Sequence, residues 1–339
     1  MDDEIRLGAL VPIGKAQWGE GTDPRELIDF GVRAESLGYD SLWVNDSLVS
    51  PRIEALTMLA ALAPVTERVT LGTAALLPVL RRPVQAAQAL ASIDLLSGGR
   101  LVVAVGAGFP GRFGRPLHDL SEVPWSGRFA RLDETVELWR RLWSSQGPTS
   151  FHGRIYHFDE IPEPTTPYRT GGPPLWLGGA TPAALARTGR HYDGWLPYPP
   201  DPAGYLAGLA EVRKAAADAG RAPEEITPAL FLSVLIADSV EDGRRALADF
   251  SRATYGLSLE ELETIQAVIT GPREHVASQL RRYVAAGARH LVCRLGTTDL
   301  RSQREQLERI AELGPLLGRA GDGRAVSSPS PAPRTPPGR

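Results

Sequence analysis

The sequence predicts an α/β protein whose strands close into a single (β/α)8 TIM barrel. Eight short runs rich in apolar and β-branched residues recur along the 339 residues, and runs that are apolar on both faces suit a buried parallel sheet. Helical patterns lie between most of the runs, and eight is the number of strands that closes such a barrel, although an open doubly wound sheet also fits this alternation. The predicted strands are residues 5–11, 41–45, 69–76, 101–106, 174–179, 194–198, 229–237 and 290–296.

Two helices are marked clearly by their ends. After the first strand, Asp23 is suited to cap a helix, Glu26 has the spacing of a capping box, and Gly38 is suited to end it. A later helix begins at residues 271–272 and stops at Gly287, directly before the last strand. This order of helix and strand is the one that a barrel requires.

Two connections are too long for simple turns. Residues 109–127 follow the fourth strand, where we expect no helical pattern before Arg128, and residues 147–173 precede the fifth. The second segment contains FHGRIYHFDE, which is typical of a small β-hairpin around Gly153. We therefore expect a barrel with insertions after strand 4 and before strand 5.

Composition limits the classes of function. The net charge is −3, from 37 basic and 40 acidic residues, so no electrostatic reason favours nucleic acid or an anionic membrane as partner. The single cysteine excludes an internal disulfide, the histidines lack metal-ligand spacing, and we expect no metal. The chain opens without an apolar leader, which predicts a cytoplasmic protein.

We expect one domain over residues 1–317 and a disordered Pro/Ser/Gly-rich tail over 318–339.

The stretch GAGFPG at residues 106–111 follows the apolar run LVVAV and matches the pattern of a dinucleotide-binding turn. Such a turn must lead directly into a helix that holds the pyrophosphate, but the following RFGRP, rich in glycine and proline, disfavours one. We therefore reject a Rossmann site. The glycines are better explained by a flat ring pressed against the end of a strand, with a crowded strand end without ligand as the alternative.

Several stretches resemble the luciferase-like monooxygenase family, whose members are (β/α)8 barrels that bind reduced FMN or the deazaflavin coenzyme F420. They include LWVNDS, LAALAPVTERVTLGTAALLP, RRPVQAAQALASIDLLSGGRLVVAVGAG and PPLWLGGATPAALARTGRHYDGW, and the resemblance runs from about residue 5 to 315. It implies a bacterial luciferase-like barrel.

The resemblance implies catalytic residues at the end of the second strand. Family members commonly carry an acidic residue and then a histidine that moves a proton, whereas this chain has Asp46 and Ser47. Because a serine has no useful pKa near neutrality, a histidine-type acid or base is missing. The pair is still our candidate for catalysis; the alternative is that it only starts the next helix.

The resemblance also implies a cofactor site. It places a non-prolyl cis peptide behind the cofactor ring at Ala74-Ala75, the ring against the end of the fourth strand, and the cofactor phosphate at the turn after the fifth. Successive backbone N–H groups and a helix that begins at Pro182 suit an anion there, although an empty helix end is also common. The candidate cofactor residues are Ala74, Ala75, Gly106, Ala107, Gly108, Gly178, Gly179, Ala180 and Thr181. Phe109 stands where sugar-phosphate dehydrogenases of the family have an acid, which disfavours that activity.

Loops at the same end of the barrel supply the candidate substrate pocket. Its residues are Trp18, Arg112, His118, Glu122, Trp125 and Tyr198. His118 or Glu122 could replace the missing proton donor, although an exposed position is the more frequent outcome for each. Arg81 or Arg82, after the third strand, could hold a phosphate or a carboxylate, although a solvated pair is the more frequent outcome.

Four functions remain open. The resemblance favours hydride transfer between coenzyme F420 and a small organic substrate; the alternative is a monooxygenase that uses reduced FMN and oxygen and depends on a separate flavin reductase. A non-catalytic flavin-binding barrel and a cofactor-free lyase or isomerase, for which only Asp46 and Arg294 are obvious ionisable groups, rank lower. The partner is a small molecule, and a homodimer is compatible with the apolar helix faces.

Overall fold

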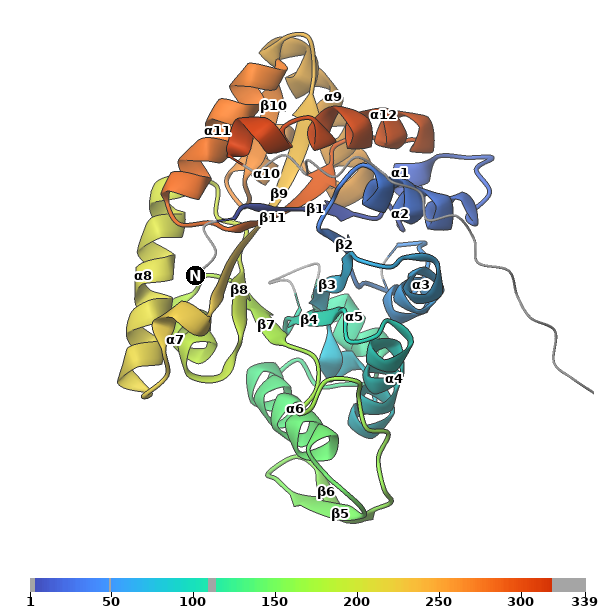
Figure 1. Cartoon of the computed structure of the whole chain (residues 1–339), viewed down its shortest axis with the longest axis vertical. Coiled ribbons are helices and arrows are strands. Elements are labelled where there is room, and N and C mark those ends of the chain that lie inside the picture. Colours follow the sequence, from blue (N-terminus) through green and yellow to red (C-terminus); the bar gives the residue numbers. More distant parts are fainter. Residues whose placement is uncertain (1–3, 49, 109–113, 319–339) are drawn as a thin grey trace, which may run out of the picture.

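The computed structural model describes residues 4–48, 50–108 and 114–318, and in these residues eight parallel strands form a closed ring (Figure 1). Neighbouring strands pair in the order β1, β2, β3, β4, β7, β8, β9 and β11, and β11 pairs back to β1. The predicted barrel is therefore confirmed. The strands of the ring are β1 (Arg6–Leu10), β2 (Ser41–Val44), β3 (Thr70–Leu76), β4 (Leu101–Val105), β7 (Leu175–Gly178), β8 (Gly194–Leu196), β9 (Thr227–Ile236) and β11 (His290–Leu295).

The helices surround this ring, and alternate strand residues reach them. On β11, Leu291 and Cys293 pack outward into the large core between strands and helices, whereas Val292 belongs to the cluster inside the ring. The helices are α1 (Lys15–Trp18), α2 (Glu26–Ser36), α3 (Ala55–Leu62), α4 (Pro83–Leu96), α5 (Arg115–Leu120), α6 (Arg128–Trp143), α7 (Pro182–His191), α8 (Pro202–Asp218), α9 (Val240–Tyr255), α10 (Leu259–Glu263), α11 (Arg273–Ala285) and α12 (Leu300–Ala311).

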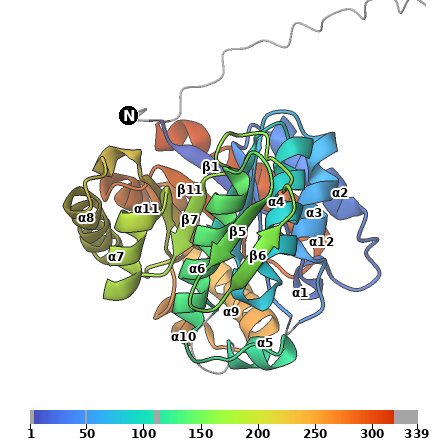
Figure 2. The ribbon, with the colours of Figure 1, turned by 90° about the horizontal axis from the view of Figure 1, so that it is seen from below.

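An additional strand, β10 (Val268–Gly271), was not predicted from the sequence. The first residues of the long strand β9 pair with β8, and its second half, Ser233–Ile236, pairs with β10. Strand β9 thus extends past the C-terminal end of β8. Figure 2 shows α5, α9 and α10 at one end of the barrel, the end to which the strands carry their C-termini.

The two long connections differ in how well they were predicted. The hairpin is confirmed as β5 (Thr149–His152) and β6 (His157–Ile161), and Glu134 of α6 accepts hydrogen bonds from the backbone N–H groups of its turn, 2.6 Å from that of Tyr156. The absence of a helix before residue 128 is wrong, because α5 begins at Arg115. Pro116 lies in the first turn of α5, where a missing N–H disrupts no hydrogen bond.

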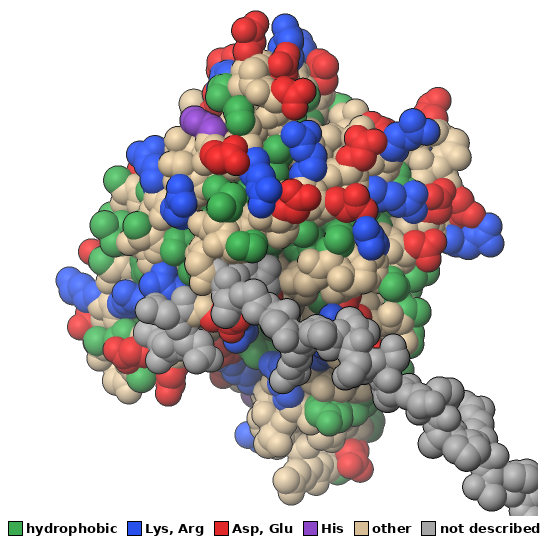
Figure 3. Space-filling view, turned by 45° about the horizontal axis from the view of Figure 1, so that its top comes forward, with side chains coloured by type: hydrophobic (Ala, Val, Ile, Leu, Met, Phe, Trp, Pro, Cys, Tyr) green, Lys and Arg blue, Asp and Glu red, His purple; other side chains and the backbone are tan. Residues whose placement is uncertain are grey.

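The first predicted helix is α2, with a corrected start. It begins at Glu26 and has no side-chain cap, because Asp23 accepts from the N–H and guanidinium of Arg25 instead. Its predicted end is confirmed, since Gly38 has a φ of 85°. On the face seen in Figure 3, acidic and basic side chains are interspersed over the helices, in keeping with the small net charge.

Tryptophans fill the barrel below its C-terminal mouth. Trp43 and Trp176 stand with ring centroids 5.2 Å apart, and a Cβ atom at Gly8 or Gly72 would overlap Trp43. Beneath them, the Ser41 hydroxyl lies 2.7 Å from His290 Nε2 and accepts from Trp43 Nε1. Burial lowers the pKa of His290 to about 3, so the ring is neutral. The interior is therefore a packed core, and any ligand must bind at the mouth above it.

Candidate active site

Above the tryptophans, the ends of three neighbouring strands carry small residues at the mouth. Among the residues that the structure describes, a Cβ atom built on Gly106 would meet a single neighbour within 4 Å, Ala75 Cβ at 3.9 Å, and one on Gly178 would meet backbone oxygens at 3.6 Å or more. The peptide bond between Ala74 and Ala75 is cis, as the family resemblance implied. The ends of β3, β4 and β7 thus form a rim, Ala74–Ala75, Gly106 and Gly178, whose open space suits the face of a flat ring.

The turn from β7 into α7 suits the second part of such a ligand. Gly179 has a φ of 95°, and the Thr181 hydroxyl accepts from the N–H of Ala184, 3.3 Å away, as the N-cap of α7. Ala180 and Thr181 are exposed, and since Pro182 has no N–H and that of Ala184 donates to Thr181, the backbone donors proposed for a ligand are those of Gly179, Ala180, Thr181 and Ala183. An anionic group is the ligand that this helix end favours.

Asp46 is held by an ion pair that the sequence did not predict. Its Oδ2 atom accepts from Arg81 Nη1 at 2.5 Å and from the N–H of Leu77 at 2.9 Å, and Arg81 also donates to Glu54 Oε1 at 2.7 Å. The side chains of Asp46 and Arg81 are 6% and 21% exposed, so a solvated Arg81 is wrong, although Arg82 is exposed as predicted.

The ion pair determines what Asp46 does in the fold. Burial alone would lower the pKa of Arg81, but the hydrogen bonds and charges of Asp46 and Glu54 outweigh it and raise that pKa. Asp46 therefore joins the end of β2 to the segment after β3. The alternative that residues 46–47 start the next helix is wrong, because α3 begins at Ala55 and is capped by the Glu54 side chain. A catalytic role of Asp46 and Ser47 stays a prediction.

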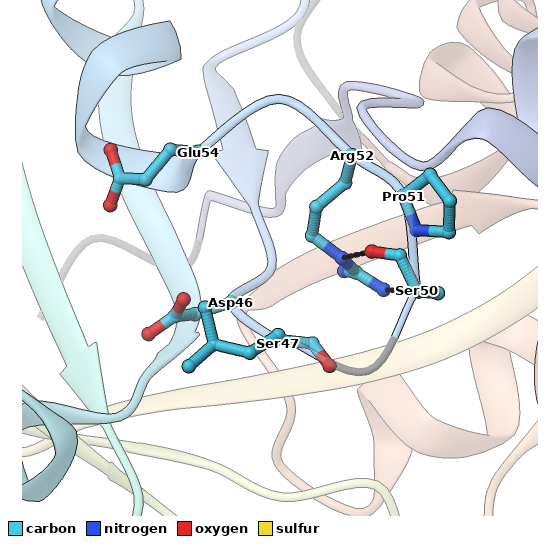
Figure 4. Close-up of a pocket in the computed structure, with 7 residues that line it drawn as sticks. Asp46, Ser47, Ser50, Pro51, Arg52 and Glu54 are labelled. Carbon is cyan, nitrogen blue, oxygen red and sulfur yellow. Dashed lines mark hydrogen bonds between the residues drawn. The ribbon is translucent and has the colours of Figure 1, made fainter. Parts of the chain in front are cut away.

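A cavity of about 420 Å³ opens between the end of β2 and the start of α3 (Figure 4). Arg52 and Ser50 lie on one side of it in the figure, and Asp46 and Glu54 lie on the other. Its lining residues are Asp46, Ser47, Leu48, Ser50, Pro51, Arg52 and Glu54. A small molecule in this cavity would contact Asp46 and Ser47, the predicted catalytic pair.

Helix α5 brings His118 against the end of β4. Its Nε2 atom lies 3.4 Å from the carbonyl oxygen of Ala107, and its ring contacts Trp125 edge to face at 5.0 Å. His118 is fully buried, which corrects the expected exposure, and its Nδ1 has no hydrogen-bond partner among the described residues. Glu122 is exposed, and Arg112 lies outside the described residues. His118 is thus the better placed of the two proposed proton donors.

Strand β11 brings a second group of polar residues to the mouth. Arg294 is 4% exposed and donates to the hydroxyl of Tyr255 at 2.6 Å and to Gln17 Oε1 at 3.2 Å. Tyr255 in turn donates to Gln266, 3.3 Å away. Only Arg294 was noted in the sequence, since its partners come from segments tens to hundreds of residues away and no local pattern marks them.

Two predicted pocket residues lie on this polar side or near it. Tyr198, just after β8, packs against the cluster inside the ring, and burial raises the pKa of its hydroxyl. Trp18, the last residue of α1, is partly buried against the outer core. Tyr198 therefore lies at the mouth, whereas Trp18 contributes to packing between α1 and its neighbours.

Within the described ranges, no cluster of side chains could ligate a metal, and no helix is both long and apolar enough to cross a bilayer.

The family model of the luciferase-like monooxygenases matches residues 5–290, and the chain belongs to this family. An F420-dependent glucose-6-phosphate dehydrogenase of Amycolatopsis mediterranei is 33% identical over 55% of this chain, a region that spans only 57% of the relative. The enzyme of the same name from Nakamurella multipartita is 32% identical over 83% of this chain and 90% of its own length.

Solved structures with the same fold are more distant in sequence. An F420-dependent secondary alcohol dehydrogenase in complex with an F420-acetone adduct superposes with a TM-score of 0.76 at 20% identity, covering 93% of this chain and 99% of its own. The oxygenating constituent of a Baeyer-Villiger monooxygenase of Pseudomonas putida, in complex with FMN, gives 0.73 at 16% identity, with coverages of 92% and 98%. At these identities the similarity establishes the barrel fold.

Proposed function

We propose that this chain is an F420-dependent oxidoreductase that transfers hydride to or from a small organic substrate. The observation that carries the proposal is the rim of Ala74–Ala75, Gly106 and Gly178, where the described residues leave space for added atoms above a filled barrel. The dehydrogenases that share about a third of their aligned residues with this chain support the choice of cofactor.

The residues present fit the deazaflavin in two parts. Ala74, Ala75 and the stretch Gly106–Gly108 would lie against its ring, since none has a side chain larger than a methyl group. Gly178, Gly179, Ala180 and Thr181 would hold its phosphate at the N-terminus of α7. When bound, the coenzyme supplies hydride-transfer chemistry, and the barrel orients it and excludes water.

The chain itself must move the proton that accompanies hydride transfer. Ser47 can donate a hydrogen bond at the cavity beside β2, and His118 Nε2 lies at the end of β4, next to the backbone proposed to contact the ring. We assign the proton to His118, because an imidazole nitrogen can both accept and donate a proton and this one lies beside the backbone proposed to contact the ring. Asp46 is a positioning residue that fixes the segment after β3 through Arg81.

A reduced-FMN monooxygenase is the second candidate, favoured by the fold shared with the FMN-bound oxygenase constituent. It would require a separate flavin reductase. Titrating the purified chain with F420 and with FMN, following the quenching of each cofactor's fluorescence, separates the two candidates. We expect saturable binding of F420 at lower concentration than FMN; tighter FMN binding with substrate-dependent oxygen uptake would establish the alternative, and binding of neither would refute both.

A further inference from the structure

Two arginines at the mouth of the barrel lack a carboxylate partner. Among the described residues, neither Arg52 nor Arg294 forms a salt bridge with an acidic side chain, whereas Arg81 nearby engages two. We call Arg52 and Arg294 the mouth arginines. Burying a guanidinium without an opposite charge is unfavourable. A site that holds two such guanidinium groups therefore favours the binding of an anionic ligand.

The hydrogen-bond and ring partners of Arg294 among the described residues are all neutral. The two terminal guanidinium nitrogens of Arg294 donate to Tyr255 and Gln17, and its Nε has no acceptor among the described residues. The guanidinium carbon, Cζ, lies 4.8 Å from the ring centre of Tyr255 and 5.3 Å from that of Phe250. The rings and hydrogen bonds hold the guanidinium in place without neutralising it.

The hydrogen-bond partner of Arg52 among the described residues is also neutral. It donates to the Ser50 hydroxyl at 2.5 Å and to the Ser50 carbonyl at 3.4 Å, while its buried Nη1 finds no acceptor in the part of the chain described. Figure 4 shows this side chain beside Ser50 in the cavity. Burial, together with the charge of Arg294, lowers the pKa of Arg52 to about 10, and the charge of Asp46 opposes this effect only in part. The mouth arginines thus lie close enough to repel each other.

The backbone brings the two arginines to one place. The segment of Arg52 runs along the loop after β1, with the N–H of Lys15 donating to Pro51 at 2.9 Å and that of Ile53 donating to Ile13 at 3.0 Å. Gln17, two residues beyond Lys15, receives the hydrogen bond from Arg294. Because the loops after β1 and β2 are joined in this way, Arg52 and Arg294 share one side of the mouth.

That side faces the rim across the barrel. In the ring order, three strands separate β11 from β4 in either direction, so Arg294 lies on the strand opposite Gly106. The acidic residues of the cavity, Asp46 and Glu54, are both engaged by Arg81. Counting those two carboxylates and three guanidinium groups, this side of the mouth retains a net positive charge.

We propose that the mouth arginines bind an oxyanion of the substrate, a carboxylate or a phosphate monoester, while its reacting carbon lies toward the rim. This inference rests on the proposed function only in taking the anion to be part of the substrate. Guanidinium groups suit such oxygens because their planar N–H donors bind two at once. The proposal predicts discrimination between organic anions and neutral molecules of the same shape.

The first test needs no variant. Calorimetric titration of the full chain, with and without saturating F420, compares glucose 6-phosphate with glucose and benzoate with benzamide. We expect the anion of at least one pair to bind about tenfold more tightly or better than its neutral partner, the gain typical of a charge-assisted hydrogen bond. The pair that discriminates more identifies phosphate or carboxylate as the preferred group, and equal binding within both pairs would overturn the proposal.

Variants then locate the effect. Arg52→Gln and Arg294→Gln should each remove most of the discrimination, and Arg252→Gln, which removes a charge that is 69% exposed and paired with Asp249, should keep it. Equal losses in all three would show a general effect of net charge and would overturn the site. Arg52 lies at the cavity, so its variant keeps the test valid if Arg294→Gln does not fold.

The outcome remains distinct from that of the cofactor titration. If F420 binds and no anion is preferred, this inference fails while the proposed function stands. If neither cofactor binds but the anion preference persists and depends on the mouth arginines, the proposed function fails and the anion site stands.

Discussion

Replacing Gly106 with valine perturbs the rim at its most open point. The φ of Gly106 is not among the positive values, its N–H donates to the carbonyl of Leu76, and among the described residues an added Cβ atom would meet only Ala75 at 3.9 Å. The fold therefore tolerates the change, and we expect the free energy of unfolding to change by less than about 1 kcal/mol. The added methyl groups would instead occupy the space proposed for the cofactor ring.

The expected effect is on cofactor binding. Loss of contact between the ring and the strand end should weaken F420 binding by more than about 100-fold, which corresponds to about 2.7 kcal/mol. The assay is a fluorescence titration with F420, combined with thermal unfolding of the same preparation. The matched comparison is Gly72→Ala, whose added carbon would overlap Trp43, so it should lower thermal stability by the roughly 1–3 kcal/mol typical of an overpacked core.

The reasoning is refuted if Gly106→Val binds F420 as the unchanged chain does. It is also refuted if Gly106→Val lowers stability as much as Gly72→Ala, because the space above Gly106 would then not be open.

Three further outcomes follow from the geometry. Thr181→Val removes the cap of α7 and should weaken F420 binding about tenfold, while binding of a deazaflavin fragment that lacks the phosphate should change little. Ser239→Ala removes the cap of α9 instead, and in the same titrations it should leave the binding of both ligands unchanged. Asp46→Ala leaves the half-buried Arg81 with Glu54 as its one carboxylate partner among the described residues and should cost about 3 kcal/mol of unfolding free energy, measured by denaturant titration; an unchanged midpoint would show that the ion pair contributes nothing. Burial lowers the pKa of His290 from 6.5 to about 3, so below pH 6.5 the unfolded chain binds a proton that the folded chain does not. The unfolding free energy should fall with acidity by up to about 1.4 kcal/mol per pH unit at this site, and His290→Gln should reduce that slope between pH 6 and 4; the same slope in both chains would contradict it.

The elements predicted well from the sequence are those with a local signal. Apolar runs such as LVVAV at 101–105 and TLGTAAL at 70–76 are long enough to identify strands, and a glycine such as Gly38 ends a helix wherever the chain needs a positive φ. The strand β10 was missed because its four residues are too few to show a period and follow a helical pattern directly. The helix α5 was missed because proline and glycine were interpreted as breakers, although Pro116 lies in a first turn.

The candidate site was predictable only in part. The glycines at 106–108 indicated a flat ring from the sequence itself, whereas Ala74–Ala75 and Gly178 were placed at the cofactor by the family resemblance. The ion pair of Asp46 with Arg81 spans 35 positions, and the contact of Arg294 with Gln17 spans 277, so only the closed barrel brings these charges together. The burial of His118 likewise depends on how α5 folds back onto β4, which no local pattern specifies.

The crystal structure of the chain grown with F420 tests the central claim most directly. The account predicts the ring against Ala74–Ala75 and Gly106 at the mouth, with the phosphate at residues 178–181. Density for the ring on any other face of the barrel, or a phosphate away from the start of α7, would contradict it.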